Sequence, residues 1–206
     1  MTKIHITFKE LIKITIIGDP NIGHYYSKKH PNTKYTLNNI LEDILYVLKT
    51  GISWRNIRSS INWKSTYFHF QRFVKHNIFK KFYLQLRSLY FTNNKTNIQI
   101  IDSSFIMNKF GRNKVARNAF FKNKNCNKVS LLTDINGIPL SVLVNSGNVH
   151  DNSFIIDHVK DIYILNKKQN KKVTLLADKA YEGKNIRNNL NNYNYTLMVA
   201  KKKEIN

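Results

Sequence analysis

The chain has 206 residues, 42% of them apolar, which is enough to bury a core in one substantial domain and a smaller second one. Lys and Arg number 34 against 12 Asp and Glu, so the formal net charge of +22 favours a polyanion as partner, nucleic acid before an anionic membrane. The longest apolar runs are too short to cross a membrane, and Lys9, Glu10 and Lys13 interrupt the apolar N-terminus, which excludes a secretory leader. The single cysteine, Cys126, excludes an internal disulfide. We therefore expect a soluble, intracellular protein, without a preferred compartment.

The first part of the chain is predicted to be helical. Residues 1–34 show no strong periodicity and are interpreted as a lead-in segment. A helix is predicted to begin after Thr36, to carry an apolar face that ends at Leu48, and to stop at Gly51. Apolar residues spaced three and four apart between Trp63 and Tyr90 predict two more helices, with a break near Asn77. Residues 35–92 are therefore predicted to form an all-helical domain.

The helical stretch is strongly basic. Residues 44–101 contain ten Lys or Arg and no Asp or Glu. This pattern fits a helix-turn-helix type of DNA-binding domain, whereas the alternative is a solvated basic face over an aromatic core. The candidate DNA contacts in this stretch are Arg55, Arg58, Lys64, Arg72 and Lys75.

The pattern changes to strands after residue 96. The predicted strands cover residues 97–107, 128–135, 139–144, 173–177 and 195–200, with helices from about residue 152 and over residues 184–191. Asn136 and Gly137 are a hairpin signal between the second and third strands, and Asp151 is a candidate cap of the first helix. The order of strands and helices predicts a mixed sheet with helices on its faces, so the fold class is α+β or α/β, with the core at 97–206.

Two aspartates follow apolar runs in this core. Asp102 follows Ile98–Ile101 and is the only acid between residues 44 and 133, and Asp178 follows Val173–Ala177. If the two strands lie side by side, the carboxylates can share a divalent metal, because Mg²⁺ prefers hard oxygen ligands and often takes only one or two protein carboxylates. Each aspartate taken alone is explained equally well as a strand-end residue.

The residues around these aspartates resemble the DDE transposases of bacterial insertion sequences, most closely the insertion-sequence-five-like group. The motifs, in chain order, are Ile101-Asp102-Ser103-Ser104, the segment from Asp134 to Leu140, Gly147-Asn148-Val149-His150-Asp151, and Ala177-Asp178-Lys179-Ala180-Tyr181-Glu182. The helical stretch with Gly51-Ile52-Ser53-Trp54-Arg55 and Trp63-Lys64-Ser65-Thr66-Tyr67 is similar to the N-terminal domain of the same group. The resemblance spans about residues 35–203.

The resemblance implies a ribonuclease-H-like core that cleaves and transfers DNA strands. It implies that Asp102 and Asp178 are the first two catalytic, metal-binding carboxylates, with Mg²⁺ or Mn²⁺ as cofactor, and that His150 and Asp151 support them. Its expected partner is double-stranded DNA carrying the terminal inverted repeats of a mobile element, bound by the helical domain, with a homodimer on the DNA. The basic segment 111–128 would face the DNA, and its candidate contacts are Arg112, Lys114 and Arg117.

The sequence departs from the family pattern in two places. Ala180 and Glu182 stand where the family usually has Gly and Asp. The family's third carboxylate is a Glu on a helix well beyond the fifth strand, whereas only residues 201–206 follow that strand here, too few for a helix. Glu204 follows the strand too closely to replace it, so we expect an incomplete site in a C-terminally truncated chain: a decayed copy, one half of a frameshifted gene or a domesticated remnant.

Three functions follow from these patterns. The leading hypothesis is a transposase that cleaves and transfers strands at element ends, incomplete or inactive as this chain alone. The alternative is a non-catalytic DNA-binding remnant of a transposase, in which the sheet serves only as scaffold. The third is an RNA-binding or nuclease module unrelated to transposition, since the basic charge would serve either nucleic acid.

Overall fold

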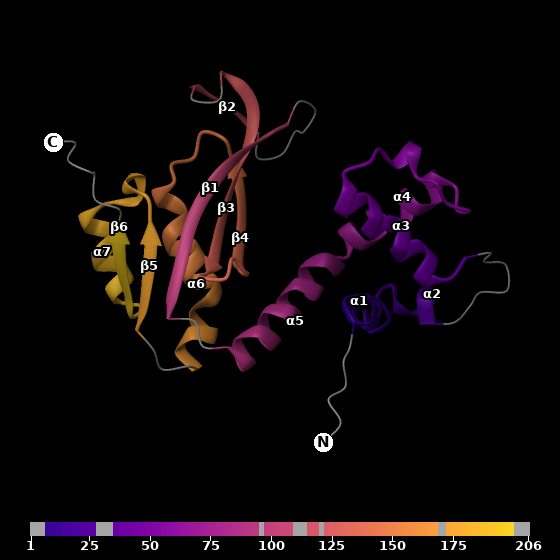
Figure 1. Ribbon diagram of the computed structural model, residues 1–206, viewed down its shortest axis with the longest axis horizontal. Helices are drawn as coiled ribbons and strands as arrows, with labels where there is room; N and C mark the ends of the chain where they lie inside the picture. Colours follow the sequence, from indigo (N-terminus) through magenta and orange to yellow (C-terminus); the bar gives the residue numbers. More distant parts are fainter. Residues whose placement is uncertain are drawn as a thin grey trace. The chain divides into compact units, whose positions relative to one another are not determined.

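The structure is a computed structural model that describes residues 7–27, 35–94, 97–108, 115–119, 122–168 and 172–199. The chain divides into a helical unit, residues 1–87, and a sheet unit, residues 88–206. The boundary falls inside α5, so the last turns of that helix belong to the sheet unit. Figure 1 shows the elements of each unit.

The helical unit packs its helices around one apolar core. Fully buried side chains from four helices meet there, among them Ile16, Ile44, Phe73 and Ile78. The elements are α1 (Phe8–Ile17), α2 (Gly23–Ser27), α3 (Leu37–Thr50), the 3₁₀ turn η1 (Trp54–Asn56), α4 (Trp63–Lys75) and α5 (Ile78–Asn93). The predicted break near Asn77 is confirmed, since Asn77 adopts a positive φ of 55° between α4 and α5.

Helix α3 begins and ends where the sequence predicts. The Thr36 hydroxyl accepts a hydrogen bond from the Asn39 backbone N–H, and the Asn39 side-chain oxygen accepts one from the Thr36 backbone N–H. Gly51 closes the helix in the left-handed conformation, with φ of 70°, which only glycine adopts at little cost. The predicted apolar face is wrong at its end, because Leu48 is 53% exposed and Val47 is buried in its place.

Residues 1–34, interpreted from the sequence as a lead-in segment without strong periodicity, contain two helices in the part that the structure describes. Helix α1 begins at a capping box, in which the Thr7 side chain caps the Glu10 backbone N–H and the Glu10 carboxylate caps Thr7. Ile12 and Ile16 lie one turn apart and are buried in the helical core, as is Ile22 just before α2. This segment therefore belongs to the helical unit.

The sheet unit is a six-stranded mixed sheet, which confirms the predicted fold class. Its elements are β1 (Ile98–Met107), β2 (Ala116–Asn118), β3 (Lys124–Asp134), β4 (Pro139–Ser146), α6 (Asn152–Lys168), β5 (Val173–Ala177), the 3₁₀ turn η3 (Lys179–Tyr181), α7 (Lys184–Asn191) and β6 (Tyr195–Val199). The strand order is β2-β3-β1-β5-β6, with β4 also paired to β3. The long β1 runs antiparallel to β3 and parallel to β5, and β5 runs parallel to β6 (Figure 1).

The two faces of the sheet differ. Helices α6 and α7 supply Ile155, Val159 and Leu190 to a core that also contains Ile101 and Leu175, so one face is covered. Residues that alternate with these along the strands point to the opposite face, which we call the open face. Its exposed apolar side chains are Ile98, Ile100, Leu131, Val142, Val144 and Met198.

The segment predicted as a DNA-facing loop at 111–128 is partly strand. Strand β3 begins at Lys124, four residues before the predicted start, because β1 is long enough to pair with it as far as Met107 and Cys126. Cys126 is fully buried in β3. Gly147 lies against it, and a Cβ at Gly147 would come 2.8 Å from the Cys126 carbonyl oxygen. None of the described helices is long and apolar enough to cross a membrane.

Candidate active site

Asp102 and Asp178 lie at the same level of adjacent parallel strands. The parallel pairing of β1 and β5 sets Ile100 opposite Leu176, and each aspartate lies two residues beyond that pair. Neighbouring strands are roughly 5 Å apart, so the register brings the two carboxylates within reach of one ion. The expectation that these two strands lie side by side is confirmed.

Both aspartates belong to the open face. Asp102 is exposed and alternates with Ile101, which is buried under the helices, and its antiparallel partner on β3 is Leu131, an exposed residue. Asp178 is exposed and alternates in the same way after the buried Leu175. Side chains on one face of a sheet at one register level are nearest neighbours, so the carboxylates share an environment that solvent and ligands reach.

In each carboxylate, one oxygen accepts a hydrogen bond from a backbone N–H and the other does not. The Ser103 N–H donates to Asp102 Oδ1 at 2.7 Å, and the Lys179 N–H donates to Asp178 Oδ1 at 2.5 Å. The Oδ2 atom of each has no hydrogen-bond partner among the described residues. Two exposed carboxylates with free oxygens are suitable donors for Mg²⁺ or Mn²⁺, so the residues present fit a divalent ion.

The described residues supply only part of a metal's ligand set. Within them, no three His, Cys, Asp or Glu side chains gather closely enough to hold a metal ion together. Divalent magnesium sites commonly complete their coordination with water and substrate phosphates.

A group of buried and half-buried polar side chains lies on the covered face directly behind Asp102. We call it the polar cluster, and its members are Ser103, Lys128, Ser130, Asp151, His158 and Tyr181. The Ser103 hydroxyl donates to Asp151 at the start of α6, and Lys128 Nζ pairs with the same Asp151 Oδ1 at 3.1 Å. Lys128 is 5% exposed and its ammonium also lies 4.8 Å from the Phe105 ring centroid.

Tyr181 connects the turn after Asp178 to this cluster. It ends η3, the 3₁₀ turn that Asp178 caps, and its ring is 2% exposed within the core of the sheet unit. Its hydroxyl lies near the hydroxyls of Ser103 and Ser130 but makes no well-formed hydrogen bond to a described residue. Burial is the main cause that raises the pKa of Tyr181. The Tyr181 ring therefore fixes the Asp178 turn against the strand that carries Asp102.

His158 completes the cluster from α6. Its Nε2 lies 2.9 Å from the Ser130 hydroxyl, and the Ser130 hydroxyl in turn donates to the Asp102 backbone carbonyl at 3.4 Å. Burial lowers the pKa of His158 to about 4, against a smaller opposing effect of Asp161, so the ring is neutral at physiological pH. The cluster thus reaches the backbone of Asp102 itself.

Of the predicted supporting pair, the structure brings only one side chain to the cluster. The Asp151 carboxylate contacts Ser103, the neighbour of Asp102, rather than serving simply as a helix cap. His150 is exposed, and its backbone carbonyl accepts hydrogen bonds from Ser153 in the first turn of α6.

The predicted DNA contacts are dispersed over the surface. In the helical unit, Arg55 and Lys64 lie over the Trp63 ring, at 5.5 and 5.9 Å from its centroid, and Arg58 lines a surface pocket with Glu42 and Asp43. Lys75 is exposed on α4, and Arg72 lies over two aromatic rings. In the sheet unit Arg117 is exposed on β2, while Arg112 and Lys114 lie outside the described residues. Lys201–Asn206, and with them Glu204, also lie outside the described residues.

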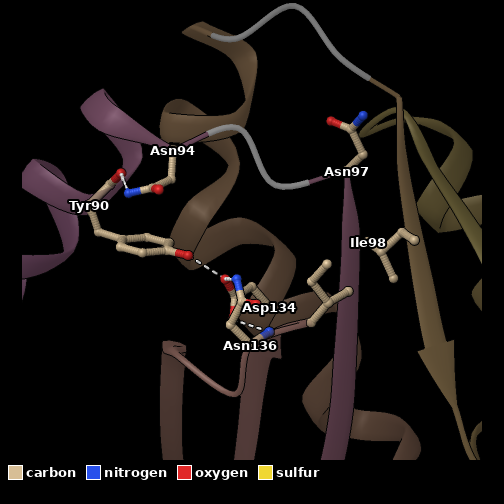
Figure 2. Close-up of a pocket in the computed structure, with 7 residues that line it drawn as sticks. Tyr90, Asn94, Asn97, Ile98, Asp134 and Asn136 are labelled. Atoms are coloured by element: carbon tan, nitrogen blue, oxygen red, sulfur yellow. Dashed lines mark hydrogen bonds between the residues drawn. The ribbon is translucent and has the colours of Figure 1, made fainter.

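A separate pocket of about 330 Å³ lies between the end of α5 and the β3–β4 hairpin (Figure 2). Asp134 is its buried acid, and it accepts hydrogen bonds from the Tyr90 hydroxyl and from the backbone N–H groups of Asn136, at 2.9 Å, and Ile138, at 2.8 Å. Burial raises the pKa of Asp134, but these hydrogen bonds outweigh burial and lower it below its ordinary value. The Asp134 carboxylate is therefore an ionised brace of the hairpin and not a free ligand.

Sequence reasoning missed most of the polar cluster. Ser103 and Tyr181 fall within the quoted motifs but received no role, and Lys128 and His158 were not singled out. A local signal existed for Lys128, because it occupies an inward position in the alternation of Cys126, Ser130 and Leu132 along β3. No such signal existed for His158, whose burial depends on how α6 packs.

The comparisons with known proteins agree with this architecture. A family model described as "Transposase DDE domain" matches residues 93–206, more than half of the chain. No curated protein matches the chain. The fold is similar to that of a piggyBac transposase in a synaptic complex with hairpin DNA, with a TM-score of 0.55 and 12% identity, over 97% of this chain and 52% of that one. A Mos1 transposase in a paired-end complex with the left transposon end matches more weakly, with a TM-score of 0.35 and 12% identity, over 82% of this chain and 60% of that one. The chain thus spans about half the length of the piggyBac chain.

Proposed function

Since the chain belongs to the transposase DDE-domain family, we propose that it acts in DNA transposition and that Asp102 and Asp178 bind the Mg²⁺ or Mn²⁺ used to cleave and transfer DNA strands. The observation that carries this proposal is the pair of free carboxylate oxygens at one register level on adjacent parallel strands. An aspartate that only ends a strand does not require a second aspartate on the neighbouring strand, at the same register level and on the same face of the sheet.

The residues around the two aspartates have separate roles in this proposal. When bound, divalent ions supply Lewis-acid chemistry that activates water and stabilises the leaving oxygen in phosphodiester cleavage. Asp102 and Asp178 bind and hold the ions in place, while the N–H groups of Ser103 and Lys179 fix one oxygen of each and so turn the other outward. The Asp151–Ser103 hydrogen bond and the Tyr181 ring keep the two backbone segments from moving apart. This is the rigid support that a metal site needs in order to keep its geometry.

We propose double-stranded DNA as the substrate, with the terminal inverted repeats of a mobile element as the specific sites. The net charge of +22 supports a phosphate backbone as partner, and Arg55, Arg58, Lys64, Arg72, Lys75 and Arg117 are the described residues that would contact it. The similar piggyBac structure is itself a complex with hairpin DNA. A homodimer would bring two element ends together, and the stoichiometry of the protein–DNA complex would test that part of the proposal.

A cleavage assay tests the metal-dependent function. DNA carrying the repeats that flank the coding sequence is incubated with the chain and Mg²⁺ or Mn²⁺, and nicked products are measured for the wild type, Asp102→Asn and Asp178→Asn. Asp157→Asn is the matched control, because Asp157 is an exposed acid on α6. Cleavage by the wild type and the control only, with DNA binding retained by all four proteins, would support the proposal and would overturn the expectation from the sequence that the site is incomplete in this chain alone. Cleavage that survives Asp102→Asn would contradict the proposal.

The alternative is a non-catalytic DNA-binding protein. It is favoured by one observation, that the described residues do not gather three metal-binding side chains. Under this alternative all four proteins would bind the same DNA equally and none would cleave it with either metal. The same assay therefore separates the two functions.

A further inference from the structure

Two exposed aromatic rings and an arginine form a small surface on the helical unit. Tyr25 on α2 is 54% exposed and Phe68 on α4 is 56% exposed. The Arg72 guanidinium lies over both, 4.1 Å from the Tyr25 ring centroid and 5.5 Å from that of Phe68. We call Tyr25, Phe68 and Arg72 the stacking surface. What sets this surface apart from a singly exposed ring is the guanidinium that lies over both rings.

Side chains next to the stacking surface connect it to the helical core. The Tyr26 hydroxyl and His69 Nδ1 are 2.8 Å apart, and the Tyr26 ring packs 5.3 Å from that of Phe73, which is fully buried. The guanidinium already lies over both rings without a ligand, an arrangement that suits a preformed binding surface. Burial, and after it the charge of Arg72, holds the pKa of His69 below its ordinary value.

No carboxylate of the described residues neutralises Arg72. The described part of the helical unit contains four acids, and each contacts another partner: Glu10 contacts Thr7, Asp19 contacts Lys81, Glu42 contacts Lys9, and Asp43 contacts Thr66. Lys75 follows Arg72 by one helical turn and is exposed, so the charge next to the rings is positive. An anionic ligand is thus favoured at this surface.

We propose that the stacking surface binds unpaired nucleotides of DNA, with one base stacked on Phe68 or Tyr25 and its phosphate near Arg72 and Lys75. An aromatic ring accepts the flat face of any base, and a guanidinium adds both stacking and charge. A paired base inside a duplex has both faces covered by its neighbours, so only gapped, bulged or frayed DNA can use the rings. A protein partner would also accept exposed aromatic rings and an arginine, but the positive charge around them favours the nucleic acid. The inference rests on the proposed DNA partner and does not need the proposed cleavage.

Competition between two DNAs of the same sequence tests the inference. One is a complete duplex and the other carries a three-nucleotide gap, and binding of the full chain is followed by fluorescence anisotropy. We expect the wild type to bind the gapped DNA more tightly by roughly five- to a hundredfold, the range that base–aromatic stacking gives. Phe68→Leu and Tyr25→Leu should each remove most of that preference, and Arg72→Lys should reduce it because lysine keeps the charge without the planar group.

Two controls separate stacking from charge and from misfolding. Lys64→Gln should weaken binding to both DNAs by the same factor, because it removes a positive charge outside the stacking surface. Tyr46→Leu removes another exposed aromatic ring, on α3, and should leave the preference unchanged. Tryptophan emission from Trp54 and Trp63, which lie in the same unit, reports whether each variant is folded.

Four results would overturn the inference. Equal binding of both DNAs by the wild type would overturn it alone and leave the proposed DNA partner intact. A preference for gapped DNA that survives Phe68→Leu and Tyr25→Leu would mean that the unpaired bases stack on other residues. Failure to bind either DNA would overturn this inference together with the proposed DNA partner. If Phe68→Leu changes the self-association of the protein but not its preference for gapped DNA, the stacking surface is a protein interface instead.

Discussion

The helical unit and the sheet unit differ in what they bury. The helical core is made of Ile, Leu and Phe side chains. The buried carboxylate of Asp19 in this unit pairs with the partly exposed ammonium of Lys81. The sheet unit buries Lys128, Ser130 and His158 together, directly behind Asp102. Because buried polar groups cost free energy unless they are paired, their concentration behind one exposed carboxylate supports the proposed role of Asp102.

The largest expected effect is on the helical unit. Phe73→Ala removes a fully buried ring at the centre of the helical core and should lower the free energy of unfolding by about 3–5 kcal/mol. Urea unfolding followed by tryptophan emission measures it, because Trp54 and Trp63, the only two tryptophans, are both in this unit. A loss below about 1 kcal/mol would show that the core is not continuous at Phe73.

Acid should destabilise the sheet unit through His158. Its pKa is lowered from 6.5 to about 4 in the folded state, so the unfolded chain takes up a proton between these values while the folded chain does not. The contribution of His158 is complete above pH 6.5 and is lost as the pH falls towards 4, by about 3 kcal/mol in total. Circular dichroism of urea unfolding at pH 6.5, 5.5 and 4.5 measures the loss.

The matched variant for this test is His158→Gln, which cannot gain the proton and should show a shallower profile, with the part due to His69, whose pKa is also lowered, remaining. Asp19 and Asp134 also have lowered pKa values, but as carboxylates they act below their ordinary value of 3.8 and so fall outside this window. An equal slope in the variant would assign the acid sensitivity to other groups.

Breaking the ion pair of the polar cluster should cost less. Asp151→Ala leaves the Lys128 ammonium buried without its anion, and we expect a loss of about 2 kcal/mol, below the usual range for a buried pair because Asp151 is 27% exposed. Lys128→Met should cost less than Asp151→Ala, since the remaining carboxylate can be solvated. Hydrogen exchange of the β3 amides measures both variants, and the reverse order would mean that the lysine, and not the aspartate, is the solvated partner.

The smallest expected effect is at the hairpin brace. Tyr90→Phe removes one hydrogen bond to Asp134 and keeps those from Asn136 and Ile138, so the loss should be about 1 kcal/mol at neutral pH. Because that bond helps to lower the pKa of Asp134, its contribution is present above the ordinary pKa of an aspartate and disappears as the carboxylate becomes protonated in acid. A difference between wild type and variant that stays constant down to pH 2 would contradict this assignment.

Elements with local signals were predictable. Helix α3 follows from Thr36 and Gly51, and β5 and α7 begin and end at the predicted residues because each is a short apolar or amphipathic run between polar turns. Helix α1 had an equally good signal in the Thr7–Glu10 capping box and the spacing of Ile12 and Ile16, so its omission was an error of interpretation and not a limit of the sequence.

Features that depend on distant pairing were not predictable in the same way. The polar start of β3 is strand only because β1 extends far enough to pair with it, and neither segment alone indicates that length. The candidate site was predictable only in part. The positions of Asp102 and Asp178 after apolar runs could be predicted from the sequence, but the contact of Asp151 with Ser103 depends on how α6 packs against the sheet. Tertiary packing, which no local pattern encodes, decides such contacts.

The most direct test of the central claim is a Mn²⁺ titration of the purified chain followed by electron paramagnetic resonance, with Asp102→Asn, Asp178→Asn and the control Asp157→Asn. If Asp102 and Asp178 share an ion, either substitution should weaken Mn²⁺ binding at least about tenfold, within the range for altered metal-site residues, and the control should bind as the wild type does. Mn²⁺ binding that is equal in all four proteins would contradict the account, because it would place the ion away from the two strands.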